Sequence, residues 1–218
     1  TVGEFAISLP SARIEAREIP THREMQAGTK VVVLGTGTPI PDAHRAGPSI
    51  AVIHKGNSYL FDAGAGAARQ ATIARYLYDI PSLYPSQICC VFLSHLHSDH
   101  TLDLSELAHT LWWRRRNPLL VWGPLGISRI SSAITDMIAI DADFRINGLQ
   151  PVANSEGFKI QDTTIEPGII LHRDDLQVEA FLANHGDISP AYGFKIVTDD
   201  ISIVISGDTA FSLSLIHI

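Results

Sequence analysis

Four potential metal ligands lie within six residues of this chain, in the order His95, Leu96, His97, Ser98, Asp99 and His100. They follow an apolar run, residues 88–93, whose length and bounding turn formers predict a buried strand. Imidazole and carboxylate groups are costly to bury without partners, so a cluster of this density indicates a metal site. These donors suit Zn²⁺, with Mn²⁺ or iron as alternatives.

The spacing of these ligands predicts two ions rather than one. His95 and His97 are two residues apart near a strand end, so their side chains can reach the same point. Asp99 and His100 lie beyond the bend and can face a neighbouring point. Two adjacent ions can share a hydroxide and hold both the attacking and the leaving oxygen of a hydrolysis.

Three more polar residues come at the ends of strand-like runs. His185 follows the run 176–182, and Asp208 follows the run 201–206. We expect Asp208 to bridge the two cations, with the preceding glycine allowing a sharp turn into the site. Asp62 also ends a strand, in a glycine-rich turn, and we interpret it as orienting a metal ligand rather than binding metal itself. The alternative is an ordinary turn aspartate.

These residues lie within motifs that occur in one order between residues 30 and 210. The motifs are Gly35-Thr36-Gly37-Thr38-Pro39, Phe61-Asp62-Ala63-Gly64, the segment from Ser94 to His100, His185, and Ser206-Gly207-Asp208-Thr209. They resemble the metallo-β-lactamase superfamily, in the branch that holds ribonuclease Z and the arylsulfatase-like metallohydrolases. The His-x-His-x-Asp-His core is the specific part of the match.

The resemblance implies an α/β fold, a four-layer αββα sandwich with its metals at one edge between two sheets. It also implies the ligand sets: the first ion is held by His95, His97 and His185, the second by Asp99 and His100, and Asp208 bridges the two ions. A metal-bound hydroxide would attack the substrate. Asp99 and Asp208 are therefore the expected catalytic residues, with Asp99 relaying a proton to the leaving group.

The chain divides into a predicted N-terminal extension at 1–29, a hydrolase domain at 30–212 and a tail at 213–218. The family supplies one more histidine to the second ion, further along, whereas this chain ends ten residues after Asp208. We therefore expect the second half of the sandwich to be incomplete and the tail, Leu213 to Ile218, to be non-native.

Small phosphate or sulfate esters are the leading predicted substrates. Ribonuclease Z enzymes grip transfer RNA with a basic arm, but here only Thr198, Asp199 and Asp200 join two predicted strands at that place. The net charge of −7 also disfavours nucleic acid. The one basic run, residues 114–116, is interpreted as a solvated helix end. The alternatives are a transfer RNA 3′ processing endonuclease and an inactive metal-binding fragment.

Other features set broad limits. No run reaches the roughly 18 apolar residues needed to cross a bilayer. The only two cysteines, Cys89 and Cys90, are adjacent in a predicted strand, so we expect them to be unpaired core residues. The compartment, cytoplasmic or periplasmic, stays open, and a homodimer is possible. Helices are expected near 11–18 and at 65–78, 102–115 and 127–140, with strands between them.

Overall fold

The computed structural model of the protein describes residues 28–211. The helix predicted near 11–18 and the tail at 213–218 lie outside the described residues. One sheet has six strands in the order β1 to β6. These are β1 (Lys30–Gly35), β2 (Ser49–His54), β3 (Asn57–Phe61), β4 (Cys90–Phe92), β5 (Leu119–Gly123) and β6 (Ile160–Thr164). The first three strands pair antiparallel, whereas β3 to β6 run parallel.

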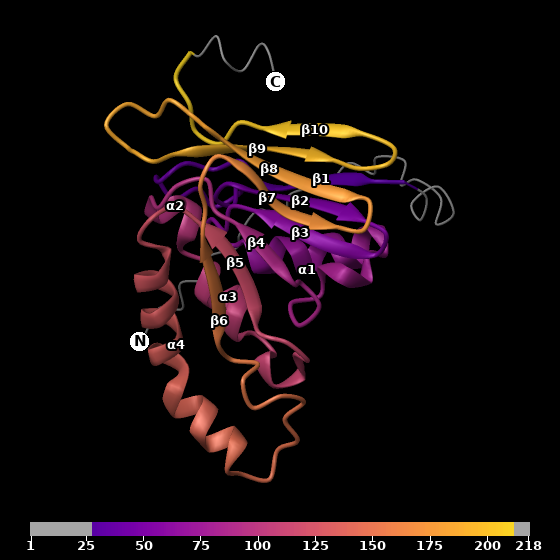
Figure 1. Ribbon diagram of the computed structural model, residues 1–218. Coiled ribbons are helices and arrows are strands. Elements are labelled where there is room, and N and C mark those ends of the chain that lie inside the picture. Colours follow the sequence, from indigo (N-terminus) through magenta and orange to yellow (C-terminus); the bar gives the residue numbers. More distant parts are fainter. Residues whose placement is uncertain (1–27, 212–218) are drawn as a thin grey trace, which may run out of the picture.

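The second sheet is antiparallel and has the order β10-β9-β8-β7. Its strands are β7 (Gly168–Arg173), β8 (Leu176–Leu182), β9 (Tyr192–Val197) and β10 (Ser202–Ile205). Along the chain, the strands β3 to β6 are connected by helices and 3₁₀ turns. The helices are α1 (Ala67–Tyr78), α2 (Ser98–Thr101), α3 (Leu104–His109) and α4 (Ile127–Ile146), and the 3₁₀ turns are η1 (Pro81–Leu83) and η2 (Trp112–Arg114). Figure 1 shows the second sheet on one side of the first and α1 and α3 on the other.

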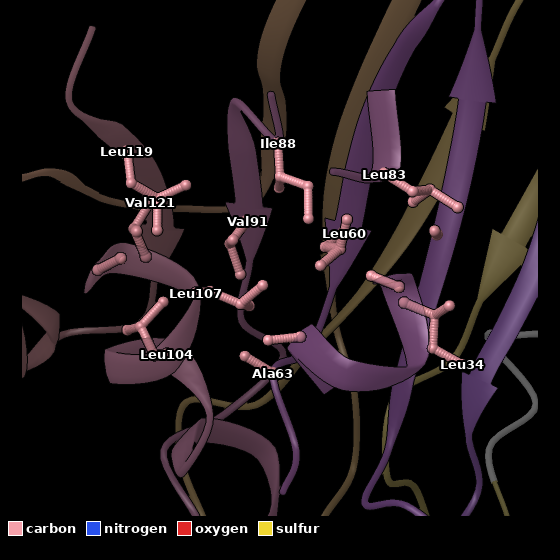
Figure 2. Packing of buried hydrophobic residues seen from close by; sticks show 14 of the residues in the cluster. Leu34, Leu60, Ala63, Leu83, Ile88, Val91, Leu104, Leu107, Leu119 and Val121 are labelled. Atoms are coloured by element: carbon pink, nitrogen blue, oxygen red, sulfur yellow. The ribbon is translucent and has the colours of Figure 1, made fainter. Parts of the chain in front are cut away.

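Alternation along the central strands produces two separate cores. In β3, Leu60 packs in one hydrophobic cluster while Tyr59 and Phe61 pack in the other. Strand β4 divides in the same way, with Val91 in the first cluster and Phe92 in the second. Successive side chains of a strand point to opposite faces, so the first sheet is buried on both sides. Figure 2 shows the first cluster, where leucines of α3 pack on this sheet.

The described residues thus form three layers of the predicted αββα sandwich: helices, six-stranded sheet and four-stranded sheet. The mixed α/β architecture confirms the predicted fold class. Within 28–211, no helix covers the outer face of the second sheet, where Ile169 and Val204 are exposed. None of the helices described is both long and apolar enough to cross a bilayer.

The helix predicted at 102–115 is wrong in its extent. The chain instead forms α2, α3 and η2, and it leaves helical geometry at Leu111, whose φ is +58°. This turn buries both Trp112 and Arg115. The Arg115 guanidinium donates to the backbone carbonyls of Ile88, Pro85 and Leu107, so this residue is not part of a solvated helix end as predicted.

The prediction that the two cysteines are unpaired is also wrong. Cys89 and Cys90 form a disulfide. Strand β4 begins only at Cys90, so the alternation of side chains that we expected to separate the two sulfurs does not extend to Cys89. Helix α4 differs as well, because it continues to Ile146, six residues beyond its predicted end.

Candidate metal centre

The predicted ligands converge from four places in the chain. His95 lies three residues after the end of β4, and Asp99 and His100 lie on the short helix α2 rather than in a loop. His185 comes after β8 of the second sheet, and Asp208 comes after β10. Both sheets therefore contribute to one site, at the edge where β4, β8 and β10 end. This arrangement agrees with the convergence expected from the sequence.

The first group of ligand atoms consists of three imidazoles. One ring nitrogen each from His95, His97 and His185 lies within 4.8 Å of the others. Nε2 of His95 is 2.9 Å from Nδ1 of His97. Nε2 of His185 is buried and has no hydrogen-bond partner. A buried nitrogen without a partner is costly in a folded protein, and a cation at the centre of the three rings would satisfy it.

The second group combines one imidazole with carboxylates. Nε2 of His100 lies 3.5 Å from Oδ1 of Asp208 and 3.6 Å from Oδ2 of Asp99. This nitrogen is also buried and makes no hydrogen bond. His95, His100 and Asp208 form a further set whose ligand atoms lie within 4.8 Å of one another. A nitrogen that faces two carboxylates without bonding to either is suited to share a cation with them.

Asp62 lies beneath the two groups and fixes the orientation of their rings. Its Oδ2 accepts hydrogen bonds from Nδ1 of His100, at 2.8 Å, and from the Ser94 hydroxyl, at 2.9 Å. The backbone N–H of Ser94 donates to Oδ1 of Asp62. Because the Ser94 hydroxyl gives its proton to Asp62, it can only accept from Nδ1 of His95, 3.0 Å away. Both histidines then carry their protons on Nδ1 and present bare Nε2 atoms to the ligand groups.

The electrostatic environments of the two buried histidines differ. Burial, together with the nearby His100, lowers the pKa of His95 to about 4, which keeps this ring neutral at physiological pH. Burial by itself lowers the pKa of His100, but the hydrogen bond to Asp62 and the charges of Asp62, Asp208 and Asp99 outweigh it and raise the pKa. An excess of negative charge around His100 is the setting in which a divalent cation is favourable.

Unusual backbone geometry holds the site together. Asp62 has a φ of +62°, which is rare for a residue with a side chain and is stabilised here by its hydrogen bonds. Gly207, next to Asp208, has a φ of +60°, as the predicted sharp turn requires. A Cβ atom on Gly64 would collide with the Asp99 carbonyl oxygen, so a glycine is needed where this turn crosses α2.

One side of the centre is open to solvent. His97 is exposed, and the Asp208 side chain is 50% exposed. A cavity of about 560 Å³ adjoins Asp99 and is lined by the loop 38–47, including His44 and Arg45. The sequence analysis did not identify Ser94, whose hydroxyl links Asp62 to His95. Its position next to His95 at a strand end was the available signal.

The chain matches the model of the β-lactamase superfamily domain over residues 57–215. It belongs to the metallo-β-lactamase superfamily. The resemblance seen in its motifs is thereby confirmed, and the chain is a member of a hydrolase family.

Its sequence relatives include proteins named ribonuclease Z. That of Mycolicibacterium gilvum is 31% identical over 184 residues, which are 83% of this chain and 61% of the relative. That of Mycobacterium bovis is 29% identical, over 83% of this chain and 62% of the relative. The chain therefore spans about three fifths of the length of these curated relatives.

Solved structures show the same fold. The metallo-β-lactamase fold protein YhfI of Bacillus subtilis superposes with a TM-score of 0.60 and 18% identity, over 87% of this chain and 66% of that one. The short form of human tRNase Z gives 0.59 and 21% identity, covering 82% and 68%. Zn²⁺-bound PqqB of Methylobacterium extorquens gives 0.56 and 18% identity, covering 85% and 65%.

Proposed function

We propose that this chain contains the metal centre of a phosphodiesterase of the ribonuclease Z type, which cleaves precursor transfer RNA near its 3′ end. The observation that carries the proposal is the convergence of two sets of ligand atoms in a chain similar to ribonuclease Z proteins. The atoms of each set lie within 4.8 Å of one another, and the sets are His95, His97 and His185, and His95, His100 and Asp208. The similarity favours this function over the hydrolysis of small esters.

In this proposal His95, His97 and His185 would hold a first zinc ion, Asp99 and His100 would hold a second, and Asp208 would offer its carboxylate to both. The unpartnered Nε2 atoms of His100 and His185 support this assignment. Two divalent cations, when bound, supply a water of low pKa as nucleophile and Lewis-acid stabilisation of the charge that develops on the phosphate.

The residues of the chain have separable tasks in this reaction. Asp62 and Ser94 keep Nδ1 of His100 and His95 protonated, so that each Nε2 stays available as a ligand. Asp99 is buried beside His100 and borders the open cavity, where its carboxylate can accept a proton from the attacking water and pass that proton to the leaving oxygen. The loop 38–47 forms the wall against which the substrate would lie.

Cleavage of precursor transfer RNA by the purified protein, loaded with Zn²⁺ or Mn²⁺, tests the proposal. We expect cleavage near the 3′ end, lost after chelation and lost in the double variant His95→Ala/His97→Ala together with bound metal. His172→Ala, an exposed histidine outside the site, is the matched control and should keep both. Cleavage that persists in metal-free protein would reject this function, and so would absence of cleavage by metal-loaded protein.

A small phosphate or sulfate ester is the second candidate substrate, because a tight turn joins β9 and β10. The backbone N–H of Thr198 donates to the Ile201 carbonyl, and acidic Asp199 and Asp200 lie between them. This is the place where we expected a basic arm in an RNA-binding enzyme. A kcat/KM for bis(p-nitrophenyl) phosphate above that for precursor transfer RNA would favour this candidate. Loss of both activities with only one weakly bound ion would instead indicate an inactive metal-binding fragment.

A further inference from the structure

A second polar cavity lies at the other end of β4 from the metal ligands. It has a volume of about 710 Å³ and opens between the segments that lead into β4 and β5. Its charged lining residues are Arg114, Arg115, Arg116 and Arg173. No carboxylate of the described residues lines it, although the whole chain has a net charge of −7. The cavity is therefore positively charged in a protein whose net charge is negative.

Three of these guanidinium groups are not neutralised. Arg114 and Arg116 are exposed, and neither forms an ion pair with any residue in the range 28–211. Nη1 of Arg173 lies 3.7 Å from Sγ of Cys89 and 3.8 Å from Sγ of Cys90. A disulfide carries no charge, so these contacts position the Arg173 group without cancelling its charge.

Arg115 has a different part in the cavity. It is 2% exposed, and its guanidinium donates to three backbone carbonyls, two before β4 and one on α3. Burial lowers the pKa of Arg115 to about 10, a value at which the group remains charged at neutral pH. These hydrogen bonds fix the backbone at Arg115. The backbone of its neighbours Arg114 and Arg116, whose guanidinium groups are free, is therefore held in place.

Neutral amides complete the lining, contributed by Gln87, Asn117 and Gln161. Guanidinium groups combined with amide donors are the chemistry that contacts phosphate oxygens of nucleic acids, since arginine can bind them in a bidentate manner. The apolar lining residues of the cavity are Ile88, Pro118 and Leu120, beside four arginines. An oxyanion ligand fits it better than a neutral one.

We propose that this cavity is an RNA-binding site that holds phosphodiester groups of the substrate at a distance from the metal centre. The proposal rests on the proposed function. Strand β4 lies between Cys89 of the cavity and the metal-site residue His95, and the six residues of chain from 89 to 95 allow a separation of at most about 20 Å. A folded RNA can reach across that distance, whereas a small ester cannot. The site would supply RNA contacts that the short β9–β10 turn does not.

The salt dependence of RNA binding tests this site directly. The dissociation constant of fluorescently labelled precursor transfer RNA is measured by anisotropy over a series of KCl concentrations, with Arg114→Ala, Arg116→Ala and Arg129→Ala. Arg129 is an exposed arginine of α4 outside the cavity and is the matched control. Removing one phosphate contact should weaken binding several-fold and reduce the slope of log Kd against log[KCl] by about 0.7–1.

We expect both cavity variants to show this change, with KM for precursor transfer RNA raised, and kcat and the hydrolysis of bis(p-nitrophenyl) phosphate unchanged. Slopes equal to that of Arg129→Ala would overturn the proposal. Inorganic phosphate is titrated by calorimetry as a second test. Saturable phosphate binding at the cavity, in protein whose RNA binding takes place at other sites, would also overturn the proposal, because the cavity would then hold a small anion.

The same measurements separate this inference from the proposed function. Unchanged slopes in a protein that cleaves precursor transfer RNA would reject the cavity as an RNA site and leave the activity standing. RNA that binds with the expected loss of slope but is never cleaved would reject the activity and support the cavity.

Discussion

Asp62 illustrates how one buried carboxylate sets the chemistry of two imidazoles. It accepts from His100 directly and reaches His95 through the Ser94 hydroxyl. The clustering of the candidate ligand residues could be predicted, because His-x-His-x-Asp-His carries its chemistry in residue types at short spacing. Ser94 could not be predicted in this way, since serine is common and its role arises only when folding brings Asp62 beside it.

Replacing Asp62 with asparagine should weaken metal binding without removing a ligand. An amide at this position would donate to Nδ1 of His100 and drive the proton to Nε2, which could then no longer bind a cation. We expect about a 10–100-fold loss of Zn²⁺ affinity, measured by competition with a chromophoric chelator. Asp136→Asn, on the exposed surface of α4, is the control. An affinity equal to that of the unmodified protein would refute the role given to Asp62.

The elements around the metal centre were predicted unevenly. The runs 176–182 and 201–206, which were expected to be strands, contain β8 (Leu176–Leu182) and β10 (Ser202–Ile205). The helix expected at 102–115 did not form as one element, because its apolar residues fit a continuous helix while the buried positions of Trp112 and Arg115 require a break at Leu111. Tertiary burial decides such a segment, and local periodicity does not contain that information.

Gly64→Ala tests the close approach of α2 to the turn after β3. The added Cβ would meet backbone atoms of Asp99 and Gly47, which cannot move aside as a flexible side chain can. We expect a loss of about 1–3 kcal/mol in the free energy of unfolding and weaker metal binding, as Asp99 is displaced. Chemical denaturation and Zn²⁺ titration measure the two effects. Gly56→Ala, whose Cβ would meet nothing within 4 Å, should strain its hairpin turn but leave metal affinity unchanged.

His109, at the end of α3, should make stability depend on pH. Burial lowers its pKa to about 4, with a smaller contribution from Arg115, and outweighs the opposing charge of Asp141. Unfolded chains bind this proton near pH 6.5, so the unfolded state gains protons first as the pH falls. The contribution of His109 is therefore complete above about pH 6.5 and declines towards pH 4. Thermal melts of His109→Gln should show less loss over that window, and a profile parallel to the unmodified protein would contradict this.

At the scale of the whole molecule, the site depends on two sheets staying in register. His185 and Asp208 follow strands of the second sheet, while the other four proposed ligands follow a strand of the first. The sequence shows that each ligand ends a strand, but it does not contain the angle or spacing at which the sheets pack. The resemblance to a known family supplied that expectation, and the αββα class could not have been derived from periodicity alone.

Phe194 lies in the layer that joins the sheets. It is fully buried, with its ring centroid 5.3 Å from that of Phe61 and 6.0 Å from that of Phe92. Phe194→Ala should lower the free energy of unfolding by about 3–5 kcal/mol and weaken metal binding, because both ligands of the second sheet would lose their support. Phe144→Ala, at a position 71% exposed on α4, should change stability by no more than about 0.5 kcal/mol. Equal effects of the two variants would show that the aromatic layer does not hold the sheets together.

Anomalous diffraction at the zinc absorption edge, from crystals of the protein grown with Zn²⁺, is the most direct measurement of the metal centre. Two peaks should appear, one among the rings of His95, His97 and His185 and one beside His100 and Asp99, with Asp208 between them. Peaks elsewhere, or no peak at these ligands in fully zinc-loaded crystals, would contradict the dinuclear centre on which the proposed hydrolysis depends.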